Sequence, residues 1–583
     1  MAPPTPSHWR TKSVTEKSRS TYAVRTFRRN PTPFFKLASA AVVIGFYLLY
    51  TSLHPYQPSP SSLRAGRTVQ RQDWFGRNVT RSQDERADKV REVMRGVFRE
   101  YRDKAWGYDA VKPASGGRDQ SGSWWGEFMV GGSTTLAVMR LWEELGMVVE
   151  HVVGKVYFGQ SEGLVDPFEA TKWYLGALVS LHELKEAGVV PEHAVSAEEM
   201  GRVAVKAEQL AAKLACAYDS PTGMPWPMVD VNKDVGRAVP PGISTSSPSK
   251  FSYKNPACGL ARAGSSILEN YAMSDLGGNR SYHALSQRAW APLVWNKYVE
   301  SMPGLVDGPL DIITGAPLAQ AKGWDASYGS YYEYLLKFAI LNPHDRYTRK
   351  YEERWLEAAS AIRHNLSSRS SPTDNQKAVH LFMGQVHEDG TFLNEMSHEA
   401  CAAPGNLIYG GAYFNISSLI TLGQALLETC HHLHNSTPTG LAPDSANWVS
   451  STPRQVSHFK PKSARQESEL AATGFFVADA QYNLRPEYVE SLFYAWRVTG
   501  EERYREWAWD AFTAIEKHCK TSFGYAAVKD VMAGAGRVEL VDETGTWFAA
   551  ETLKYLYLTF SDVEMGNLEE WVYTTGGHPL KRR

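Results

Sequence analysis

The sequence predicts an all-α protein, a large ring or solenoid of paired helices preceded by a single membrane anchor. Helical periodicity recurs throughout residues 86–583, whereas runs with the alternation of a strand are almost absent. The composition, 43% hydrophobic and 21% charged, is that of a globular protein. With 583 residues the chain is several times the usual domain size, so it is either multidomain or one closed repeat architecture.

The N-terminal region predicts a type II membrane protein. Basic side chains dominate residues 1–36, whose one acid is Glu16, and an apolar run follows at 37–53. At about 1.5 Å per residue this run reaches roughly 25 Å, the short end of what spans a bilayer. The positive-inside rule then places residues 1–36 in the cytosol and the rest of the chain in a lumen. A cleaved signal peptide is the alternative, and the long basic region argues against it.

A polar, proline-bearing stem at 54–85 separates the anchor from the globular domain at 86–583. Two features agree with a lumenal location. The chain has five cysteines, too few for a disulfide framework but enough for one or two bridges. It also carries N-glycosylation sequons. Their asparagines are Asn78, Asn279, Asn365, Asn415 and Asn435.

Within the globular part, the predicted helices follow one another as antiparallel pairs joined by long loops. They cover residues 89–104, 134–145, 168–187, 197–218, 263–276, 282–301, 331–341, 347–366, 411–433, 467–480, 486–499, 502–519 and 546–560. The Ser, Pro and Thr-rich segment 437–463 predicts a surface insertion. The tail after Glu570 predicts an extended segment or hairpin.

Composition also bears on which classes of ligand the protein could bind. With 62 basic and 63 acidic residues the chain has a net charge of −1, so no overall field would hold nucleic acid. The 18 Trp and 29 Tyr suit stacking on sugar rings, and they suit packing between helices equally well.

Candidate catalytic carboxylates lie where predicted helices begin. Glu169 and Glu487 each follow a proline near the first helical position, where the helix dipole favours an anion. Glu490 lies one turn beyond Glu487, next to Arg485, and Glu551 belongs to a third helix. Two carboxyl groups about 6.5–9.5 Å apart suit inverting glycoside hydrolysis. The alternative is that these glutamates only cap helices at the surface.

Several segments carry a resemblance to a known family. They are LRPEYVESLFY at 484–494, YREW at 504–507, FGY at 523–525, AETLKYLYL at 550–558, WGYD at 106–109, FEAT at 168–171, SPTG at 220–223, SYYEYLLK at 330–337 and VYTTGGHP at 572–579. Together they closely resemble glycoside hydrolase family 47, the class I α-1,2-mannosidases, and the chain resembles a divergent, fungal-type, membrane-anchored member. The resemblance covers nearly all of 86–583.

The resemblance implies an (α/α)7 barrel plugged by a C-terminal hairpin. It implies inverting removal of α-1,2-linked mannose from high-mannose N-glycans in the endoplasmic reticulum or Golgi, with a calcium ion (Ca2+) at the barrel floor. Glu169 matches the family's general acid and Glu487 its general base, while Thr575 matches the threonine that binds calcium through two oxygens.

Further residues match the family by position. His398 matches a substrate-pocket histidine, and Trp547 or Phe548 falls where the family stacks an aromatic ring under the sugar. Cys401 and Cys430 match the family's disulfide pair, which leaves Cys216, Cys258 and Cys519 reduced or buried.

The chain also departs from the family at the site. Gly329 replaces the third essential carboxylate, an aspartate, and Asp325 four residues earlier could substitute for it. Arg262 and Gly576 replace glutamates and Trp173 replaces an arginine, while VGGSTT at 130–135 replaces an aspartate-rich motif. Lost negative charge at 329 and 576 predicts weak calcium binding.

Three hypotheses follow. The chain is an active α-1,2-mannosidase or a relative of altered specificity, or it is a catalytically impaired relative that binds mannose-type glycans in quality control, or it is a scaffold for partner proteins. The retained Glu169 and Glu487 favour the first hypothesis, whereas Gly329, Arg262 and Gly576 favour the second.

Overall fold

The computed structural model describes residues 68–71, 82–120, 122–238, 255–372, 379–452, 455, 457–534, 536 and 538–583. All of these belong to the compact unit formed by residues 64–583. The expected cytosolic tail, the anchor, most of the stem and Asn78 lie outside the described residues. Within the described ranges, no helix has both the length and the apolar character needed to cross a membrane.

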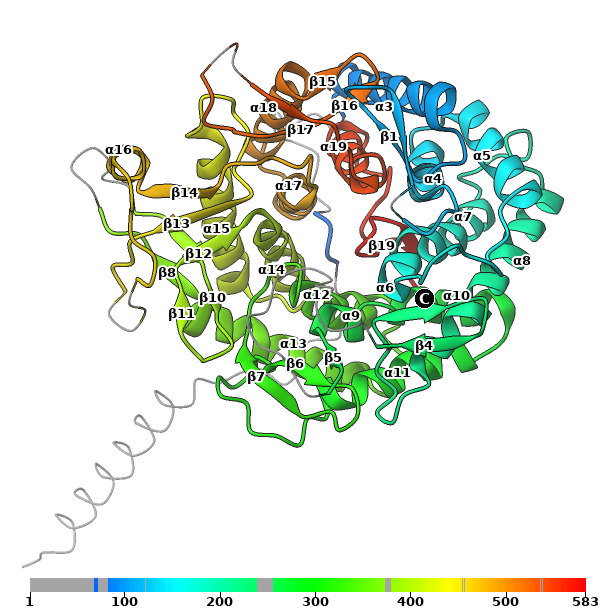
Figure 1. The fold of residues 1–583 in the computed structure, drawn as a ribbon, viewed down its shortest axis with the longest axis horizontal. Coiled ribbons are helices and arrows are strands. Elements are labelled where there is room, and N and C mark those ends of the chain that lie inside the picture. The colour runs from blue at the N-terminus through cyan, green and yellow to red at the C-terminus, as the bar shows by residue number, and fades with distance from the viewer. Residues whose placement is uncertain are drawn as a thin grey trace, which may run out of the picture. The chain divides into compact units, whose positions relative to one another are not determined.

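The unit is a helical barrel whose inner helices form a closed ring around its centre (Figure 1). In the described part of the chain, each inner helix contacts the inner helix that follows it in sequence, and the last contacts the first. They are α4 (Glu127–Val138), α7 (Gly176–Glu186), α10 (Ile267–Gly277), α12 (Gly329–Leu341), α14 (Ala402–Tyr413), α17 (Glu487–Thr499) and α19 (Leu553–Phe560). Because neighbours cover them on most sides, these helices are apolar nearly all round, as in α12, which is buried from Tyr331 to Leu341 apart from Glu333.

An outer layer of helices packs against this ring, one partner for each inner helix. Starting from the partner of α4, they are α5 (Trp142–Gly154), α8 (Ala197–Leu214), α11 (Ser281–Val294), α13 (Thr348–Ala361), α15 (Ser417–Asn435), α18 (Arg503–His518) and α3 (Asp84–Ala105). These helices are amphipathic: α8 buries Met200, Val203, Ala207 and Leu210 at helical spacing. Ser196 and Glu199 form a capping box at its start.

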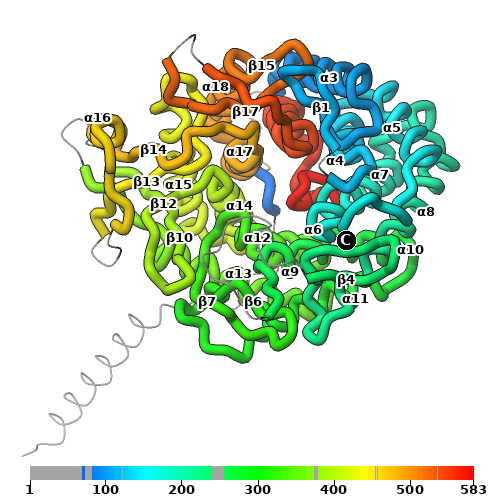
Figure 2. Tube along the Cα trace, in the orientation of Figure 1, coloured from blue at the N-terminus to red at the C-terminus, as the bar shows by residue number. Residues whose placement is uncertain are grey.

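A C-terminal hairpin lies inside the ring (Figures 1 and 2). Strands β19 (Trp571–Tyr573) and β20 (Pro579–Lys581) pair in antiparallel register, and they contact α12 and α7 respectively. Val572, Tyr573 and Leu580 are fully buried. The predicted C-terminal hairpin is therefore confirmed, and its turn faces the centre of the barrel.

Shorter elements connect the helices. The helical ones are α6 (Pro167–Ala170), η2 (Thr171–Leu175), η3 (Ala215–Tyr218), α9 (Leu260–Gly264), η4 (Ile362–Leu366), η5 (His398–Cys401), α16 (Ala464–Thr473) and η6 (Phe548–Thr552). Short strands pair as β1–β2 (Ala110–Lys112, Gly117–Asp119), β3–β4 (Met228–Asp230, Val235–Arg237), β5–β6–β7 (Ala257–Cys258, Gly308–Asp311, Pro317–Ala321), β8–β9 (Ser367–Arg369, Leu381–Met383), β10–β11 (Gln385–Val386, Phe392–Leu393), β15–β16 (Lys520–Thr521, Gly524–Tyr525) and β17–β18 (Ala527–Val528, Leu540–Val541).

One small sheet differs from the sequence prediction. Strand β13 (Ser445–Trp448) lies between β12 (Glu395–Ser397) and β14 (Phe475–Asp479). The segment 437–463 is therefore not simply a surface insertion, because Trp448 at its middle is completely buried and stacks on Phe382. The helix expected at 467–480 ends at Thr473, where Gly474 takes a left-handed conformation and starts the turn into β14.

Two other predicted helices were misplaced because a left-handed residue interrupts the chain. The predicted helix at 134–145 straddles the end of α4 and the start of α5, which Arg140 separates with φ of 59°. Similarly, Asn415 with φ of 54° separates α14 from α15, and α14 was missed. Such conformations are uncommon outside glycine, so periodicity alone does not reveal them.

Candidate active site

A cavity of about 240 Å³ opens among the first turns of the inner helices and the hairpin turn. It contains most of the expected site residues: Glu169, Asp325, Arg485, Glu487, Glu490, Trp547, Glu551 and Thr575. Trp173, which replaces an arginine of the family, lines it too, and so do side chains that were not anticipated: Lys172, Trp324, Glu333, Lys337, Glu399, Asn406 and Tyr494. The structure therefore brings the carboxylates of separate helices into one polar space.

Glu169 lies in the single turn of α6 at one side of the cavity. Asp166 caps this turn by accepting a hydrogen bond from the Phe168 amide, and Pro167 occupies the first helical position. The Arg262 guanidinium in turn contacts Asp166, with nitrogen to oxygen distances of 2.5 and 2.6 Å. Arg262 therefore serves to hold the cap of the helix that carries Glu169.

The carboxyl group of Glu169 accepts a hydrogen bond of 2.8 Å from the Trp173 indole N–H. Burial raises the pKa of Glu169, although the Lys172 ammonium works in the opposite direction. A general acid needs its proton, and the upward shift caused by burial works in that direction.

Glu487 is the first residue of α17, on a different side of the cavity. Its Oε2 atom is buried and has no hydrogen-bond partner among the described residues. Burial raises its pKa to about 8, and Arg485 partly offsets the effect. Arg485 itself is held by Glu399 and Asp444, each at 3.0 Å. An unpartnered carboxylate oxygen beside a cavity is available to accept a proton from water.

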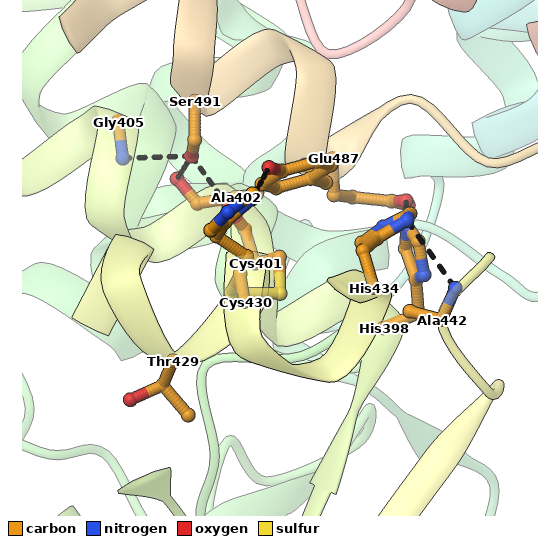
Figure 3. The surroundings of a disulfide bond; sticks show 12 residues. His398, Cys401, Ala402, Gly405, Thr429, Cys430, His434, Ala442, Glu487 and Ser491 are labelled. Carbon is orange, nitrogen blue, oxygen red and sulfur yellow. Dashed lines mark hydrogen bonds and ion pairs between the residues drawn. A yellow bond between two sulfur atoms is a disulfide. The ribbon is translucent and has the colours of Figure 1, made fainter. Parts of the chain in front are cut away.

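The start of α17 is bonded to the start of α14 by several contacts (Figure 3). The Ser491 hydroxyl donates to the Cys401 carbonyl and accepts a hydrogen bond of 2.8 Å from the Gly405 amide. Cys401 and Cys430 form the predicted disulfide, with their Cα atoms 6.0 Å apart. The other three cysteines are free, and two of them, Cys258 and Cys519, are buried.

Gly329 and Asp325 lie on the same wall of the cavity. The Gly329 amide bonds to the Asp325 carbonyl at 2.6 Å, and a Cβ atom at 329 would lie 3.1 Å from the Trp324 carbonyl oxygen. An aspartate at 329 therefore needs a small shift of this loop. Burial raises the pKa of Asp325 to about 6, and repulsion from Glu399 adds to the effect. The Asp325 carboxyl is thus one turn away from the missing aspartate and faces the same cavity.

Thr575, in the hairpin turn, forms part of the cavity floor. Its amide donates to the Tyr334 hydroxyl at 3.0 Å, and that hydroxyl donates to buried Glu269 at 2.5 Å. The Thr575 hydroxyl lies 3.1 Å from the Ser330 hydroxyl. These contacts fix the hairpin turn against α12 and α10, and they leave the Thr575 side chain beside the cavity.

Two lysines place ammonium groups beside three carboxylates of the cavity, Glu333, Glu490 and Glu551, which we call the floor carboxylates. Lys172 lies 3.2 Å from Glu551, and Lys337 contacts Glu333 closely and Glu490 at 3.4 Å. Burial raises the pKa of Glu551, and raises that of Glu490 to about 7, while the neighbouring ammonium groups work in the opposite direction. A lysine among acids in a helix is usually a solvated surface residue, so the sequence offered no reason to place either ammonium inside the barrel.

Two expected site residues do not line the cavity. His398 is 3% exposed behind the wall, with Nε2 at 3.9 Å from Glu487 Oε2, and burial lowers its pKa to about 3, so the ring is neutral. Phe548 is fully buried and packs on Tyr525. Trp547, in contrast, lines the cavity, and Arg485 lies over its ring at 5.6 Å.

The remaining departures from the family pattern have structural explanations. Thr134 within 130–135 bonds to His578 Nδ1 and to Lys554, so this segment packs α4 against the hairpin and α19. At Gly576 a Cβ atom would come within 2.7 Å of the Lys172 carbonyl oxygen. The hairpin therefore approaches η2 too closely for any side chain at 576.

The described sequon asparagines lie on the outside of the unit. Asn279, Asn415 and Asn435 are exposed, and Asn365 is half-buried. Glycosylation at these positions stays a prediction.

Comparisons with known proteins agree with this geometry. Residues 93–582 match the model of glycosyl hydrolase family 47. A mannosyl-oligosaccharide alpha-1,2-mannosidase 1B of Emericella nidulans is 32% identical over 87% of this chain and 94% of its own length. A mannosyl-oligosaccharide alpha-1,2-mannosidase of Penicillium citrinum is 30% identical over 91% of this chain and 96% of its own. The solved alpha-1,2-mannosidase from Trichoderma reesei matches with a TM-score of 0.77 and 27% identity, covering 86% of this chain and all of the other.

Proposed function

We propose that this chain, which belongs to glycosyl hydrolase family 47, is a glycosidase that removes α-1,2-linked mannose from N-glycans with inversion. The observation that carries the proposal is the pair Glu169 and Glu487, which face one cavity from two separate helix starts. The names of the relatives from Emericella nidulans and Penicillium citrinum supply the substrate class. We also infer that the closed ring with its outer partners is the seven-pair barrel, (α/α)7, of this family.

In the proposed reaction, Glu169 protonates the oxygen of the leaving sugar. Burial raises the pKa of Glu169, which favours the protonated form, and the Trp173 indole fixes the orientation of the carboxyl group. Glu487 takes a proton from the attacking water through Oε2, the atom without a hydrogen-bond partner among the described residues. The Trp547 ring offers an apolar face to the sugar. The two groups thus supply the acid and the base that inversion requires.

Asp325 is proposed as a supporting carboxylate in place of the aspartate that Gly329 replaces. Its carboxyl group lines the cavity one turn before Gly329 and accepts a hydrogen bond of 3.2 Å from the Ser327 amide. Negative charge there would stabilise the positive charge that develops on the sugar in the transition state.

Calcium is the ion implied by the family resemblance, with Thr575 as its ligand. The surrounding groups fit it poorly, because two carboxylates of the same cavity, Glu551 and Glu490, already face the ammonium groups of Lys172 and Lys337. In the described part of the chain no three Asp, Glu, His or Cys side chains converge in a way that could hold a metal ion. The proposed reaction is therefore written without a step through calcium.

The proposal includes a lumenal location, in the endoplasmic reticulum or Golgi, with residues 37–53 as a signal anchor in type II topology. The basic flank before the apolar run and the exposed sequon asparagines support it. High-mannose N-glycans of glycoproteins are the proposed partners.

Gly329 favours a second candidate function, glycan binding without efficient hydrolysis. Neither Gly329 nor Ser330 offers a carboxylate, so this function keeps the pocket but lacks the charge that the family aspartate supplies at position 329.

Mannose release from a high-mannose glycan by the purified lumenal domain distinguishes the two. Release of β-mannose, seen by proton NMR before mutarotation, supports the enzyme. Glycan binding without release, together with a gain of activity in Gly329→Asp, supports the second candidate. Release of α-mannose contradicts inversion.

A further inference from the structure

Lys172 belongs to η2, the helical turn that directly follows the turn carrying Glu169. The His578 ring Nε2 atom lies 3.0 Å from the Lys172 carbonyl oxygen, and the absent side chain at Gly576 lets the hairpin come this close. The backbone of Lys172 is therefore fixed to the hairpin turn that contains Thr575, at the cavity floor.

The Lys172 side chain extends into the cavity from this anchor. Its ammonium lies 3.2 Å from the buried Glu551 carboxylate and 4.0 Å from the centre of the Trp173 ring. The side chain is 18% exposed, and it lines the cavity together with Glu169 and Thr575. The contacts place a positive charge between the candidate acid and the floor.

The acidic groups of the floor already have cationic partners without any added ion. Lys172 faces Glu551, and Lys337 faces both Glu333 and Glu490. A divalent cation prefers sites rich in unpaired oxygen ligands, and an ammonium group offers it no lone pair. Lys172 and a divalent ion therefore compete for the same carboxylate, Glu551.

We propose that the Lys172 ammonium is the resident cation of the cavity floor and that it takes the role of a divalent metal ion, so this protein binds its sugar without calcium. An ammonium has three N–H donors, and Glu551 lies on one side of it at 3.2 Å. Because Lys172 also lines the cavity, the hydroxyl groups of a bound sugar would supply acceptors for its other donors. The proposal rests on the glycan-binding cavity proposed above, but its test does not depend on turnover.

The test measures calcium binding directly. Calcium chloride and terbium chloride are titrated into the chelator-treated glycosylated lumenal domain, with melting temperature and terbium luminescence sensitised by Trp173 and Trp547 as readouts. We expect no change in the wild type up to millimolar calcium. Lys172→Gln frees Glu551 and is expected to bind calcium at least tenfold more tightly than the wild type, with a rise in melting temperature.

Two further variants show whether the effect of Lys172→Gln comes from the lost positive charge in the cavity or from a general change in packing. Lys172→Arg keeps the positive charge and is expected to stay unresponsive to calcium. Lys185→Gln removes a lysine of similar exposure, 13%, that pairs with Glu192 outside the cavity, and it is expected to behave as the wild type.

Micromolar calcium or terbium binding by the wild type would overturn the proposal, as would a Lys172→Gln protein that gains no calcium response. A Lys172→Gln protein that does not fold even with calcium present would also count against it, since calcium should replace the lost charge. A wild type that binds neither calcium nor glycan contradicts the proposed function and leaves the metal result valid.

Discussion

The two sides of the cavity hold their catalytic carboxylates by different means. Glu169 lies in a four-residue helix whose position depends on an ion pair between Asp166 and Arg262. Glu487 starts a thirteen-residue helix that Ser491 joins to the backbone at Cys401, and the adjacent disulfide joins Cys401 to α15. By the family resemblance, Trp173 and Arg262 on the Glu169 side stand where the family has an arginine and a glutamate. If Glu169 and Glu487 act as proposed, the acid and base are retained while the wall that supports the acid has changed.

The largest expected effect comes from removing either carboxylate. Glu169→Gln and Glu487→Gln should each lower kcat about 10²–10⁴-fold, because each substitution removes one proton-transfer group. Mannose release under substrate saturation measures the effect. Glu208→Gln, whose carboxylate bonds to Tyr282 outside the cavity, is the control and should keep full activity. Equal activity of Glu487→Gln and the wild type would show that the base lies elsewhere, with Asp325 the first alternative.

Breaking the disulfide tests how the Glu487 side is held. Cys401→Ser with Cys430→Ser opens a loop with a sequence separation of 29. The chain-entropy model predicts a loss of roughly 3–4 kcal/mol in the free energy of unfolding. Denaturant unfolding of the double variant and of Cys216→Ser, a free cysteine, provides the comparison. Unchanged stability of the double variant would show that the disulfide does not hold this side of the cavity.

Arg262→Met tests how the Glu169 side of the cavity is held. The unpaired Asp166 would then hold α6 less firmly, at a cost of about 1–2 kcal/mol in stability because the pair is only partly buried. We expect the rise in activation free energy, calculated from kcat, to exceed the loss in the free energy of unfolding, since Glu169 is displaced. Arg288→Met, which removes a guanidinium bonded to the Ser220 carbonyl, is the control. A fall in stability with unchanged kcat would make Arg262 a packing residue only.

The pH dependence of kcat/KM is the smallest expected effect, and it tells which carboxylate is the base. The base must be ionised, so kcat/KM should rise with pH through the pKa of the base, which is about 8 for Glu487. If Asp325 is the base instead, the rise should come at about 6. The profile of Asp325→Asn decides between them: an unchanged rising limb assigns the base to Glu487, and its disappearance assigns it to Asp325.

The sequence predicted the disulfide through the family resemblance and the C-terminal hairpin through the pattern of the tail, and the structure confirms both. It also placed Glu169 and Glu487 at helix starts, and the structure brings them to one cavity, while their roles as acid and base stay predictions. It missed Lys172, Lys337 and Glu399, whose roles depend on helices that are distant in the chain. His398 and Phe548 are buried and do not line the cavity. A match to a family position does not tell whether the side chain reaches the cavity or packs behind it. The break at Asn415 was invisible to periodicity, because a left-handed residue leaves the apolar pattern intact.

The hairpin at the centre of the ring also bears on biosynthesis. Residues 571–581 are made after every helix of the barrel, yet they contact α7, whose residues leave the ribosome about 400 positions earlier, as the bond between Ser180 and the Pro579 carbonyl illustrates. Until they arrive, the inner faces of α7 and α12 lack their partner and expose apolar surface. If the domain is lumenal, as proposed, the nascent chain should depend on lumenal chaperones through most of its translation, and deletion of 571–583 should lower the yield of folded protein.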